Sequence, residues 1–451
     1  MRLVFDRGTI VFRGDAPAVS LPGARWDPRI EGYRAQACRH REILGALASA
    51  GSEFRDDVRR PQAAEEAVSE PALRPYQEAA LRAWQDASLR GIVALPTGSG
   101  KTRLAVAAMA RLGCATLCVV PTRVLLEQWR SVLGGYVARV GCYGNGDRVL
   151  APITVATYAS AERHMPQIGN RFDLLVIDEA HHAIAESQGD LFSMCTAPAR
   201  LGLTATPPRG ADGLAALAEH IGPVVYERAL GDLAGRFLAP FDVRTIRLDL
   251  EDAERERYRR EMTCFREVYG PFRERFPSAS WAEFVKAADR TNAGKRAVAA
   301  WRRAQKLLAY TEAKRQALAE LLDFHAGARV LIFTADNASA YAIARERLVM
   351  PITCDIGKRE RQRALAMFAT GELKALVSAR VLNEGIDVPD ADIAIIVGGS
   401  LGEREHVQRV GRLLRPVPGK RAVVYELVTR ASAEVGQNAR RRRGLASDVA
   451  L

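Results

Sequence analysis

The segment 94–102 reads Ala-Leu-Pro-Thr-Gly-Ser-Gly-Lys-Thr, and its residue types and spacing suit the binding of phosphate groups. Gly98 and Gly100 allow backbone N–H groups to close around a β-phosphate, and Thr102 offers a hydroxyl group to Mg²⁺. Lys101 is one of only eight lysines among 65 basic residues, and a compact ammonium on a flexible stem suits this task better than a planar guanidinium. An apolar strand-like run precedes the segment and a helix-like run follows it, as a phosphate-binding loop requires. The residues expected to hold a nucleoside triphosphate are Thr97, Gly98, Ser99, Gly100, Lys101 and Thr102.

Two carboxylates follow another largely apolar run, 172–177, in the string Asp178-Glu-Ala-His. At the carboxyl end of a parallel sheet, Asp178 is placed to hold Mg²⁺ through water. Glu179 is placed to orient the attacking water and to take its proton. Two acids could instead belong to a solvated loop, but the phosphate-binding loop earlier in the chain favours the catalytic interpretation. His181 either couples this site to the next motif or is an ordinary loop histidine.

The string 406–416 places arginines at helical steps near the end of the chain. Arg412 and Arg415 fall one helical turn apart, so both can point in one direction across a cleft. Two arginines that face a γ-phosphate would supply the charge neutralisation that phosphoryl transfer requires, and Gln408 lies in the same string. A basic surface helix is the alternative, because arginine is frequent in this chain.

The composition favours a cytoplasmic protein that binds a polyanion. A chain of 451 residues with 48% hydrophobic residues has room for about three domains with sizeable cores. Its net charge of +12 favours nucleic acid as a partner, although an arginine-rich proteome would give the same excess. The seven cysteines include no CxxC pair, so we expect no zinc ribbon or iron–sulfur cluster. The first residues lack the apolar core of a signal peptide, and no apolar run approaches about 18 residues, so we expect no membrane partner.

Alternating strand-like and helix-like segments predict an α/β architecture. Residues 1–70 predict a small N-terminal α+β region that begins with a hairpin. Short Val/Ile/Leu runs then alternate with helical segments over 71–238, which predicts a parallel sheet with helices on both faces. A second α/β domain is expected over 239–435, with a helical insertion at about 252–310, and residues 436–451 form a basic tail.

The helical insertion carries an aromatic stripe whose steps alternate between four and three residues. The stripe consists of Tyr258, Met262, Phe265, Tyr269 and Phe272. Gly270-Pro271 and Pro277 are expected to interrupt it, which predicts at least two helices. A stripe with helical spacing is more often a packing surface than a stacking platform for nucleic-acid bases, and the pattern alone leaves both alternatives open.

Eight strings occur in the order found in superfamily 2 helicases of the DEAH-box type, which the chain resembles over about residues 71–430. They begin at Arg74, Pro96, Val120, Asp178, Thr204, Ile332, Asn383 and Gln408. The strings 381–392 and 402–416 resemble more closely the XPB-type (xeroderma pigmentosum group B) DNA helicases of archaea and bacteria. Such proteins couple two RecA-like domains, a helical thumb in the second domain and an N-terminal damage-recognition domain.

The chain departs from this family in two places. The family's Arg-Glu-Asp string after the third motif is represented here by Arg209-Gly-Ala-Asp212, which argues against a wedge-like role for that loop. Residues 1–70 are also short for the family's N-terminal module.

The resemblance implies a role for each matched residue. Gln77 would read the adenine edge, with Arg74 nearby. The residues that would close the ATP site from the second domain are Gly385, Asp387, Gln408, Arg412 and Arg415. The residues that would contact the backbone of one nucleic-acid strand are Thr122, Arg123, Thr157, Thr334 and Arg380.

The motifs predict a monomeric motor that depends on ATP and Mg²⁺. The resemblance to XPB-type helicases implies that it is a DNA helicase or translocase that moves 3′ to 5′, in DNA repair or related DNA processing. Single-stranded or forked DNA is the expected substrate, because phosphate contacts carry little sequence information and suit a motor that must travel. Three alternatives stay open. They are an RNA helicase, a duplex translocase of a restriction or defence complex with a separate nuclease partner, and an ATP-dependent clamp that does not move.

Overall fold

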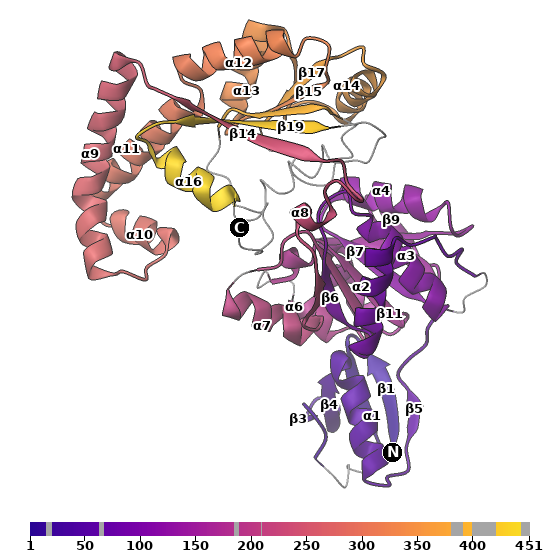
Figure 1. Ribbon diagram of the computed structural model, residues 1–451. Helices are drawn as coiled ribbons and strands as arrows, with labels where there is room; N and C mark the ends of the chain where they lie inside the picture. The colour runs from indigo at the N-terminus through magenta and orange to yellow at the C-terminus, as the bar shows by residue number, and fades with distance from the viewer. Residues whose placement is uncertain are drawn as a thin grey trace. The chain divides into compact units, whose positions relative to one another are not determined.

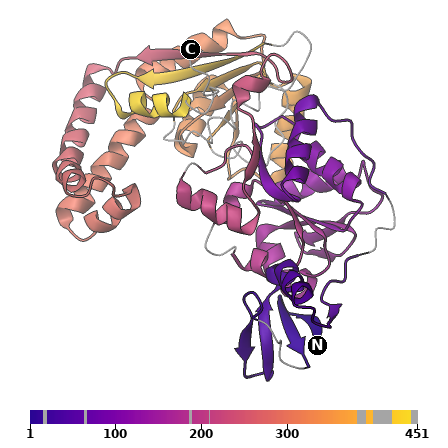
Figure 2. The ribbon, with the colours of Figure 1, turned by 60° about the horizontal axis from the view of Figure 1, so that its bottom comes forward.

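The computed structural model describes residues 1–14, 20–62, 67–184, 189–208, 210–379, 391–398 and 421–442. The chain divides into two compact units, Met1–Ala229 and Leu230–Leu451. Figure 1 colours the first unit from indigo to magenta and the second from rose to yellow, and Figure 2 shows the same ribbon from another side. No helix within these described ranges is long and apolar enough to cross a membrane.

The first unit is built around an eight-stranded sheet with the strand order β13-β6-β12-β11-β7-β10-β8-β9. Neighbouring strands are parallel except β8 and β9, which form an antiparallel hairpin. The strands are β6 (Arg90–Ala94), β7 (Thr116–Val120), β8 (Gly141–Gly144), β9 (Asp147–Val149), β10 (Ile153–Thr157), β11 (Leu174–Asp178), β12 (Ala199–Thr204) and β13 (Val224–Glu227). The apolar runs of the sequence predicted β6, β7, β10, β11 and β12, which form the centre of the sheet.

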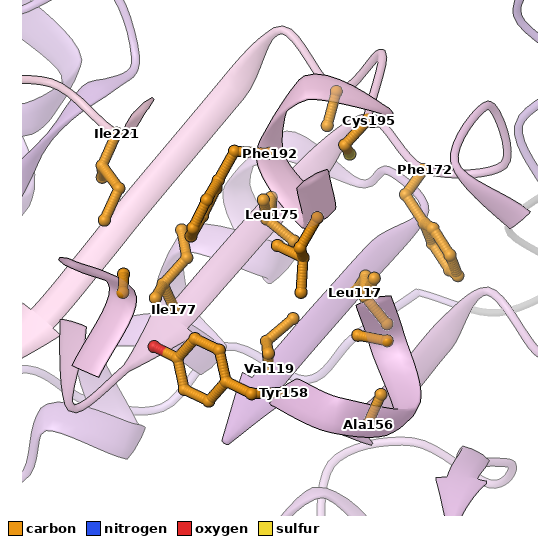
Figure 3. Packing of buried hydrophobic residues seen from close by; sticks show 14 of the residues in the cluster. Leu117, Val119, Ala156, Tyr158, Phe172, Leu175, Ile177, Phe192, Cys195 and Ile221 are labelled. Carbon is orange, nitrogen blue, oxygen red and sulfur yellow. The ribbon is translucent and has the colours of Figure 1, made fainter. Parts of the chain in front are cut away.

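Helices and short helical turns connect these strands. They are α2 (Pro75–Asp86), α3 (Lys101–Leu112), α4 (Arg123–Leu133), α5 (Tyr158–Ile168), η2 (Ala180–Ile184), α6 (Gly189–Ser193) and α7 (Ala211–His220). Figure 3 shows part of the buried cluster formed with the sheet, including Leu117, Val119, Tyr158, Phe172, Leu175, Ile177 and Phe192. Burial of each large apolar side chain of this kind contributes about 1.5–3 kcal/mol, so the strand ends that carry the site rest on a well-packed layer.

A smaller five-stranded sheet precedes this domain, with the order β3-β4-β2-β1-β5. Its elements are β1 (Arg2–Asp6), β2 (Thr9–Arg13), β3 (Arg25–Asp27), β4 (Gly32–Gln36), η1 (Ala37–Arg39), α1 (His40–Ser49) and β5 (Arg55–Asp57). The predicted hairpin is present, and Arg7 and Gly8 form its two-residue turn with φ values of 47° and 86°. Gly8 is required there for a second reason, because a Cβ atom at this position would clash with the side chain of Met194.

The chain after β5 fastens this small sheet to the larger one. The side-chain amide of Asn170 donates to the carbonyl oxygen of Val58 at 2.8 Å, and the backbone N–H of Arg60 donates to the carbonyl of Asn170 at 2.9 Å. Arg59 forms an ion pair with Asp173. Asn170 and Asp173 immediately precede β11, so the N-terminal sheet is joined to the amino ends of the parallel strands.

The second unit contains a six-stranded parallel sheet with the order β14-β19-β18-β15-β17-β16. Its strands are β14 (Phe241–Leu248), β15 (Val330–Phe333), β16 (Met350–Ile352), β17 (Ala375–Ser378), β18 (Ile393–Ile396) and β19 (Ala422–Thr429). Its helices outside the insertion are α8 (Leu230–Leu233), α12 (Glu312–Phe324), α13 (Asn337–Arg347), α14 (Lys358–Thr370) and α16 (Ala433–Arg442). Two parallel-sheet α/β domains in tandem, with a small N-terminal α+β region, confirm the predicted fold class.

The helical insertion consists of α9 (Asp252–Arg275), α10 (Trp281–Ala288) and α11 (Asn292–Ala309). The prediction that Gly270-Pro271 interrupts the first helix is wrong, because α9 continues through Pro271. Rings on both sides of this proline pack on Phe284 of α10, with centroid distances of 4.8 Å for Tyr269 and 5.1 Å for Phe272. This packing offsets the backbone hydrogen bond that the proline cannot make. The aromatic stripe is therefore a packing surface, and its first three members are buried.

Candidate functional site

The predicted site residues of the first unit gather at one edge of its large sheet. Because β6, β12, β11, β7 and β10 are parallel, the segments that follow them emerge at the same edge. These segments carry the phosphate loop after β6, Thr204 at the end of β12, Asp178 at the end of β11, Thr122 after β7 and Thr157 at the end of β10. Strand order thus brings together residues that lie more than a hundred positions apart in the chain.

The phosphate loop between β6 and α3 has a conformation that only glycine adopts easily at two positions. Gly98 and Gly100 have φ values of 82° and 81°, a region that is costly for a residue with a Cβ atom. The ammonium group of Lys101 donates to the carbonyl oxygens of Leu95 at 3.1 Å and Pro96 at 3.4 Å. A phosphate oxygen can replace these neutral acceptors, because its negative charge adds Coulomb attraction for the ammonium to the hydrogen bond.

Two hydroxyl groups flank the charged end of this loop. The Oγ1 atom of Thr97 is buried and has no hydrogen-bond partner among the residues that the structure describes. A buried polar atom of this kind is costly unless a ligand or water satisfies it, which fits a site built for a polar guest. Thr102 lies in the first turn of α3 and is half-buried, next to the backbone N–H groups at the helix N-terminus.

The helix α2 stabilises the phosphate loop through hydrogen bonds. The Tyr76 hydroxyl and the Gln77 amide nitrogen both donate to the carbonyl of Ser99, at 2.6 Å and 2.8 Å. The amide oxygen of Gln77 accepts from the backbone N–H of Arg74 at 2.9 Å. A Cβ atom at Gly100 would lie 2.6 Å from the Gln77 amide nitrogen, so the two residues fit only as they stand. The implied adenine contact stays a prediction, since in this structure the Gln77 amide supports the loop.

Asp178 is buried, and each of its two carboxylate oxygens accepts a hydrogen bond from a different donor. Its Oδ2 atom accepts from the indole N–H of Trp129 at 2.8 Å, and its Oδ1 atom accepts from the backbone N–H of Glu179 at 3.0 Å. Burial raises the pKa of the Asp178 carboxyl, while the charge of Lys101 and these two donors oppose that rise. Glu179 itself has a positive φ of 46°, a strained conformation that is concentrated at functional sites.

His181 connects the acidic motif with the end of the neighbouring strand. Its Nδ1 atom lies 3.1 Å from the hydroxyl of Thr204 and 3.5 Å from a carboxylate oxygen of Glu179. The backbone N–H of Thr206 donates to the same Thr204 hydroxyl at 3.2 Å. Of the two alternatives for His181, this geometry favours the one in which it couples the two motifs.

Thr122 and Thr157 are the N-caps of α4 and α5. Thr122 accepts a hydrogen bond from the backbone N–H of Leu125 at 3.2 Å, and Thr157 accepts one from Ser160 at 3.3 Å. Both cap residues are half-buried, and Arg123 is exposed. Two helix N-termini beside an arginine form a surface that attracts phosphate groups.

Thr334, an implied DNA contact in the second unit, is buried. Its side chain has no exposed area, and its hydroxyl donates to the carbonyl of Asp336 at 3.0 Å. Its backbone N–H donates to Ser378 at 2.9 Å. The described structure therefore gives no support to a DNA contact by Thr334, because the end of β15 is covered.

Six predicted site residues lie outside the described residues. They are Arg380, Gly385, Asp387, Gln408, Arg412 and Arg415.

Two residues that the sequence did not single out contact Asp178. One is Trp129, described above, and the other is Tyr158, whose hydroxyl donates to the main-chain carbonyl of Asp178 at 3.1 Å. The only sequence signals were that Tyr158 directly follows Thr157 and that Trp129 lies two helical turns beyond Thr122.

The oxygens of Thr102 and Asp178 are the donors that fit Mg²⁺. This ion prefers oxygen ligands and is usually held by one or two carboxylates together with waters and substrate phosphates. Within the described ranges no group of three or more His, Cys, Asp or Glu residues could hold a metal alone. The donor set therefore suits an ion that is bound together with a triphosphate.

Three family profiles match successive parts of the chain. The profile described as "Xeroderma pigmentosum group B helicase damage recognition domain" matches residues 3–58. The profile described as "Type III restriction enzyme, res subunit" matches residues 70–209. The profile described as "Helicase conserved C-terminal domain" matches residues 313–417.

Similar proteins are known from archaea and bacteria. The chain is 32% identical over 426 residues to a protein of Sulfurisphaera tokodaii named "DNA 3'-5' translocase XPB2". The matched region covers 93% of this chain and 96% of that protein. It is 31% identical to "DNA 3'-5' helicase XPB" of Kineococcus radiotolerans, of which it spans 63%. Among solved structures, the "Crystal structure of Pyrococcus furiosus Hef helicase domain" matches with a TM-score of 0.54 at 19% identity, over 81% of this chain and 97% of that chain, and supports the fold.

Proposed function

The chain belongs to the XPB-type family of DNA helicases, and we propose that it is an ATP-driven motor that moves 3′ to 5′ along DNA. One observation carries the proposal. One edge of the eight-stranded sheet carries the phosphate loop, the pair Asp178 and Glu179, and the N-termini of α4 and α5. A nucleotide site and a surface suited to a phosphate backbone thus share the ends of neighbouring strands.

Hydrolysis of ATP at this edge needs an oriented water and neutralisation of charge on the phosphates. Glu179 takes the proton of the attacking water, and His181 with Thr204 fixes the loop that carries Glu179. The ammonium of Lys101 binds phosphate oxygens in place of the carbonyls that it contacts in this structure. When bound through Thr102 and Asp178, Mg²⁺ supplies further charge neutralisation at those oxygens.

Residues of the C-terminal helicase profile are part of the same proposal. Arg412 and Arg415 would act on the charge that develops at the γ-phosphate, as arginine fingers do. Gly385, Asp387 and Gln408 would belong to the same half of the site. These assignments rest on the motif match and on the profile that covers residues 313–417.

DNA would be held through its phosphates at the first unit. Thr122, Arg123 and Thr157 offer hydroxyl, guanidinium and backbone N–H donors, which are groups that commonly bind phosphate oxygens. The net charge of +12 favours such contacts over the whole chain. A grip of this kind is largely independent of base sequence, which a moving motor requires.

A role in DNA repair or related processing is the broader part of the proposal. It is supported by the profile for a damage-recognition domain at residues 3–58. That region is joined to the amino ends of the large sheet, away from the edge that carries the ATP site. DNA could therefore contact it without entering the nucleotide site.

Two measurements on the full chain test this function. The first compares the rate of ATP hydrolysis with single-stranded DNA, duplex DNA, forked DNA and RNA at low salt, with Glu179→Gln as the inactive control. We expect stimulation by DNA, and strong stimulation by RNA alone would overturn the assignment to DNA. The second compares displacement of a short strand from duplexes with a 3′ or a 5′ tail. Dependence on the 5′ tail would overturn the direction of movement.

A second candidate is a translocase that moves on duplex DNA without separating its strands, in a restriction or defence complex. It is favoured by the restriction-subunit profile at residues 70–209. The altered string Arg209 to Asp212 also argues for movement more strongly than for strand separation. Displacement of a triplex-forming strand from duplex DNA, without displacement of the tailed strand, would decide for this candidate.

A further inference from the structure

Two helices that begin at the proposed DNA surface also contact Asp178, the residue whose carboxylate is assigned to Mg²⁺. The helix α4 follows its cap Thr122 and sends the indole N–H of Trp129 to the Oδ2 atom of Asp178, at 2.8 Å. The helix α5 follows its cap Thr157 and sends the hydroxyl of its first residue, Tyr158, to the main-chain carbonyl of Asp178, at 3.1 Å. One contact is made to the side chain of Asp178 and the other to its backbone.

These links are rigid enough to transmit a displacement. Trp129, Tyr158 and Asp178 are 2%, 3% and 7% exposed, so close packing fixes all three. Thr122 and Trp129 are seven residues apart and lie on one face of α4, about 10 Å apart along its axis. In Figure 3 the ring of Tyr158 lies beside Val119 and Ile177, the second of which directly precedes Asp178.

The two helix N-termini are also close to each other. A Cβ atom placed on Gly144 of β8 would lie 2.7 Å from Leu126 of α4 and 3.5 Å from Thr157. A single stretch of DNA backbone bound at this edge would therefore act on both helices. A shift of α4 would turn the carboxylate of Asp178, and a shift of α5 would move the end of β11, from which the strained residue Glu179 follows.

We propose that Trp129 and Tyr158 are positioning residues that couple DNA binding at the caps of α4 and α5 to the Mg²⁺–ATP site. The inference rests on the proposed function and names a route by which DNA regulates the same site. In the absence of DNA, the two hydrogen bonds hold Asp178 in one orientation. With DNA bound, the same bonds carry the new position of each helix to the metal carboxylate.

A purely structural role for the two bonds predicts a different outcome. Every buried polar group needs a partner, so the bonds could simply satisfy Asp178. Their loss would then weaken nucleotide binding equally with and without DNA. Coupling predicts instead that the effect of DNA itself is lost. The ratio of two affinities therefore separates these roles, whatever the stability of the variant.

The test measures this ratio at equilibrium in the full chain. The affinity for a fluorescent, non-hydrolysable ATP analogue with Mg²⁺ is determined with and without saturating single-stranded DNA, and the quotient is the coupling factor. By thermodynamic reciprocity, the analogue must change the affinity for DNA by the same factor, which gives an independent readout. The variants are Trp129→Phe and Tyr158→Phe, each of which removes one polar group and keeps a ring.

Matched controls come from buried aromatic residues that make similar bonds elsewhere. Trp84 is fully buried, and its indole N–H donates to the carbonyl of Arg200 at 2.9 Å. Tyr425 is 5% exposed, and its hydroxyl lies 3.0 Å from His325. Trp84→Phe and Tyr425→Phe are expected to keep the coupling factor of the natural chain.

The expected result is a coupling factor that falls towards one in both test variants. Typical coupling factors are about 5- to 150-fold, so a loss of about fivefold or more is expected. An unchanged factor in Trp129→Phe and Tyr158→Phe, or the same loss in the controls, would overturn the inference. If DNA changes neither the nucleotide affinity nor the rate of ATP hydrolysis of the natural chain, the proposed function itself is overturned. If Trp129→Phe fails to fold, Tyr158→Phe, which lacks a single oxygen atom, decides alone.

Discussion

Removal of the charge of Lys314 is expected to destabilise the second unit strongly. Its ammonium donates to a carboxylate oxygen of Glu434 and to the carbonyl of Leu308, both at 2.7 Å. The side chains of Lys314 and Glu434 are 0% and 6% exposed. The second oxygen of Glu434 accepts from the backbone N–H of Thr429 at 2.9 Å. One buried ion pair thus joins α12 and α16 to the end of α11 and the end of β19.

The geometry fixes the order of stability of two variants. Lys314→Met keeps most of the side-chain volume but leaves Glu434 buried without this cation, and loss of one partner of a buried pair costs about 3–5 kcal/mol. The double variant Lys314→Met/Glu434→Gln buries no charge at this position, and its amide oxygen can still accept from Thr429. Its cost is then closer to that of imperfect hydrogen bonding, about 1–3 kcal/mol. The double variant should therefore be more stable than the single one.

Hydrogen exchange followed by mass spectrometry is the suitable assay. Because the chain has two compact units, a global unfolding curve would mix their transitions. Peptides from α12, α16 and β19 report the opening free energy of this region directly. The matched control is Arg421→Met, which breaks the exposed ion pair with Asp242, where β19 and its neighbour β14 begin. Such surface pairs contribute about 0–1 kcal/mol.

Two outcomes would refute the reasoning. One is an opening free energy of β19 that falls no further in Lys314→Met than in Arg421→Met. The other is a double variant that is less stable than Lys314→Met alone, which would mean that the amide of the glutamine is worse placed than an isolated carboxylate.

Three further predictions concern the ATP site, the grip on DNA and the N-terminal region. Lys101→Ala should weaken both nucleotide binding and turnover, whereas Glu179→Gln should spare binding and lose about 10²–10⁴-fold in hydrolysis rate; equal loss of binding in both would contradict these roles. Affinity for single-stranded DNA should fall by about 0.7 log units per log unit of salt for each phosphate contact, and an affinity independent of salt would exclude a phosphate grip. Burial lowers the pKa of His40 below its usual value of 6.5, despite the nearby carboxylate of Asp56, so the unfolded chain binds more protons just below that pH. The N-terminal region should therefore lose stability as the pH falls from about 7.5 to about 5.5, and His40→Gln should abolish this dependence of the opening free energy, measured by hydrogen exchange in peptides from β1 and α1.

The centres of both sheets could be predicted from the sequence, whereas the strands at their edges, such as β13, β14 and β16, could not. Runs such as 174–177 are continuously apolar, as expected for strands covered on both faces. Residues 241–248 read Phe-Asp-Val-Arg-Thr-Ile-Arg-Leu, in which polar and apolar residues largely alternate. That pattern suits a half-exposed strand, but it does not show which strand lies beside it. The strand β14 pairs with β19 in full register, and its partner lies about 180 residues further along the chain.

The ATP site could be predicted because its chemistry is confined to short strings. Gly98, Lys101 and Asp178 act through backbone conformation or through charge at the end of a strand, and both are set within a few residues. Their relative placement then follows from the parallel order of the strands. The amide of Gln77 is a different case, because its partner in the structure is a carbonyl 22 residues away, and the motif alone could not show which group it binds.

The residues outside the motif that hold Asp178 could be identified only from the fold. Trp129 and Tyr158 lie 49 and 20 residues before it, and neither distance has meaning in the sequence. In the fold, both belong to helices that start at the edge where Asp178 ends its strand. Any helix that is capped at this edge has its first turns within reach of the neighbouring strand ends. Aromatic residues with a polar atom, placed at the first position or two turns into such a helix and buried, are therefore the natural candidates for links between a phosphate-binding surface and a metal carboxylate. The coupling measured in Trp129→Phe and Tyr158→Phe decides whether that argument holds in this chain.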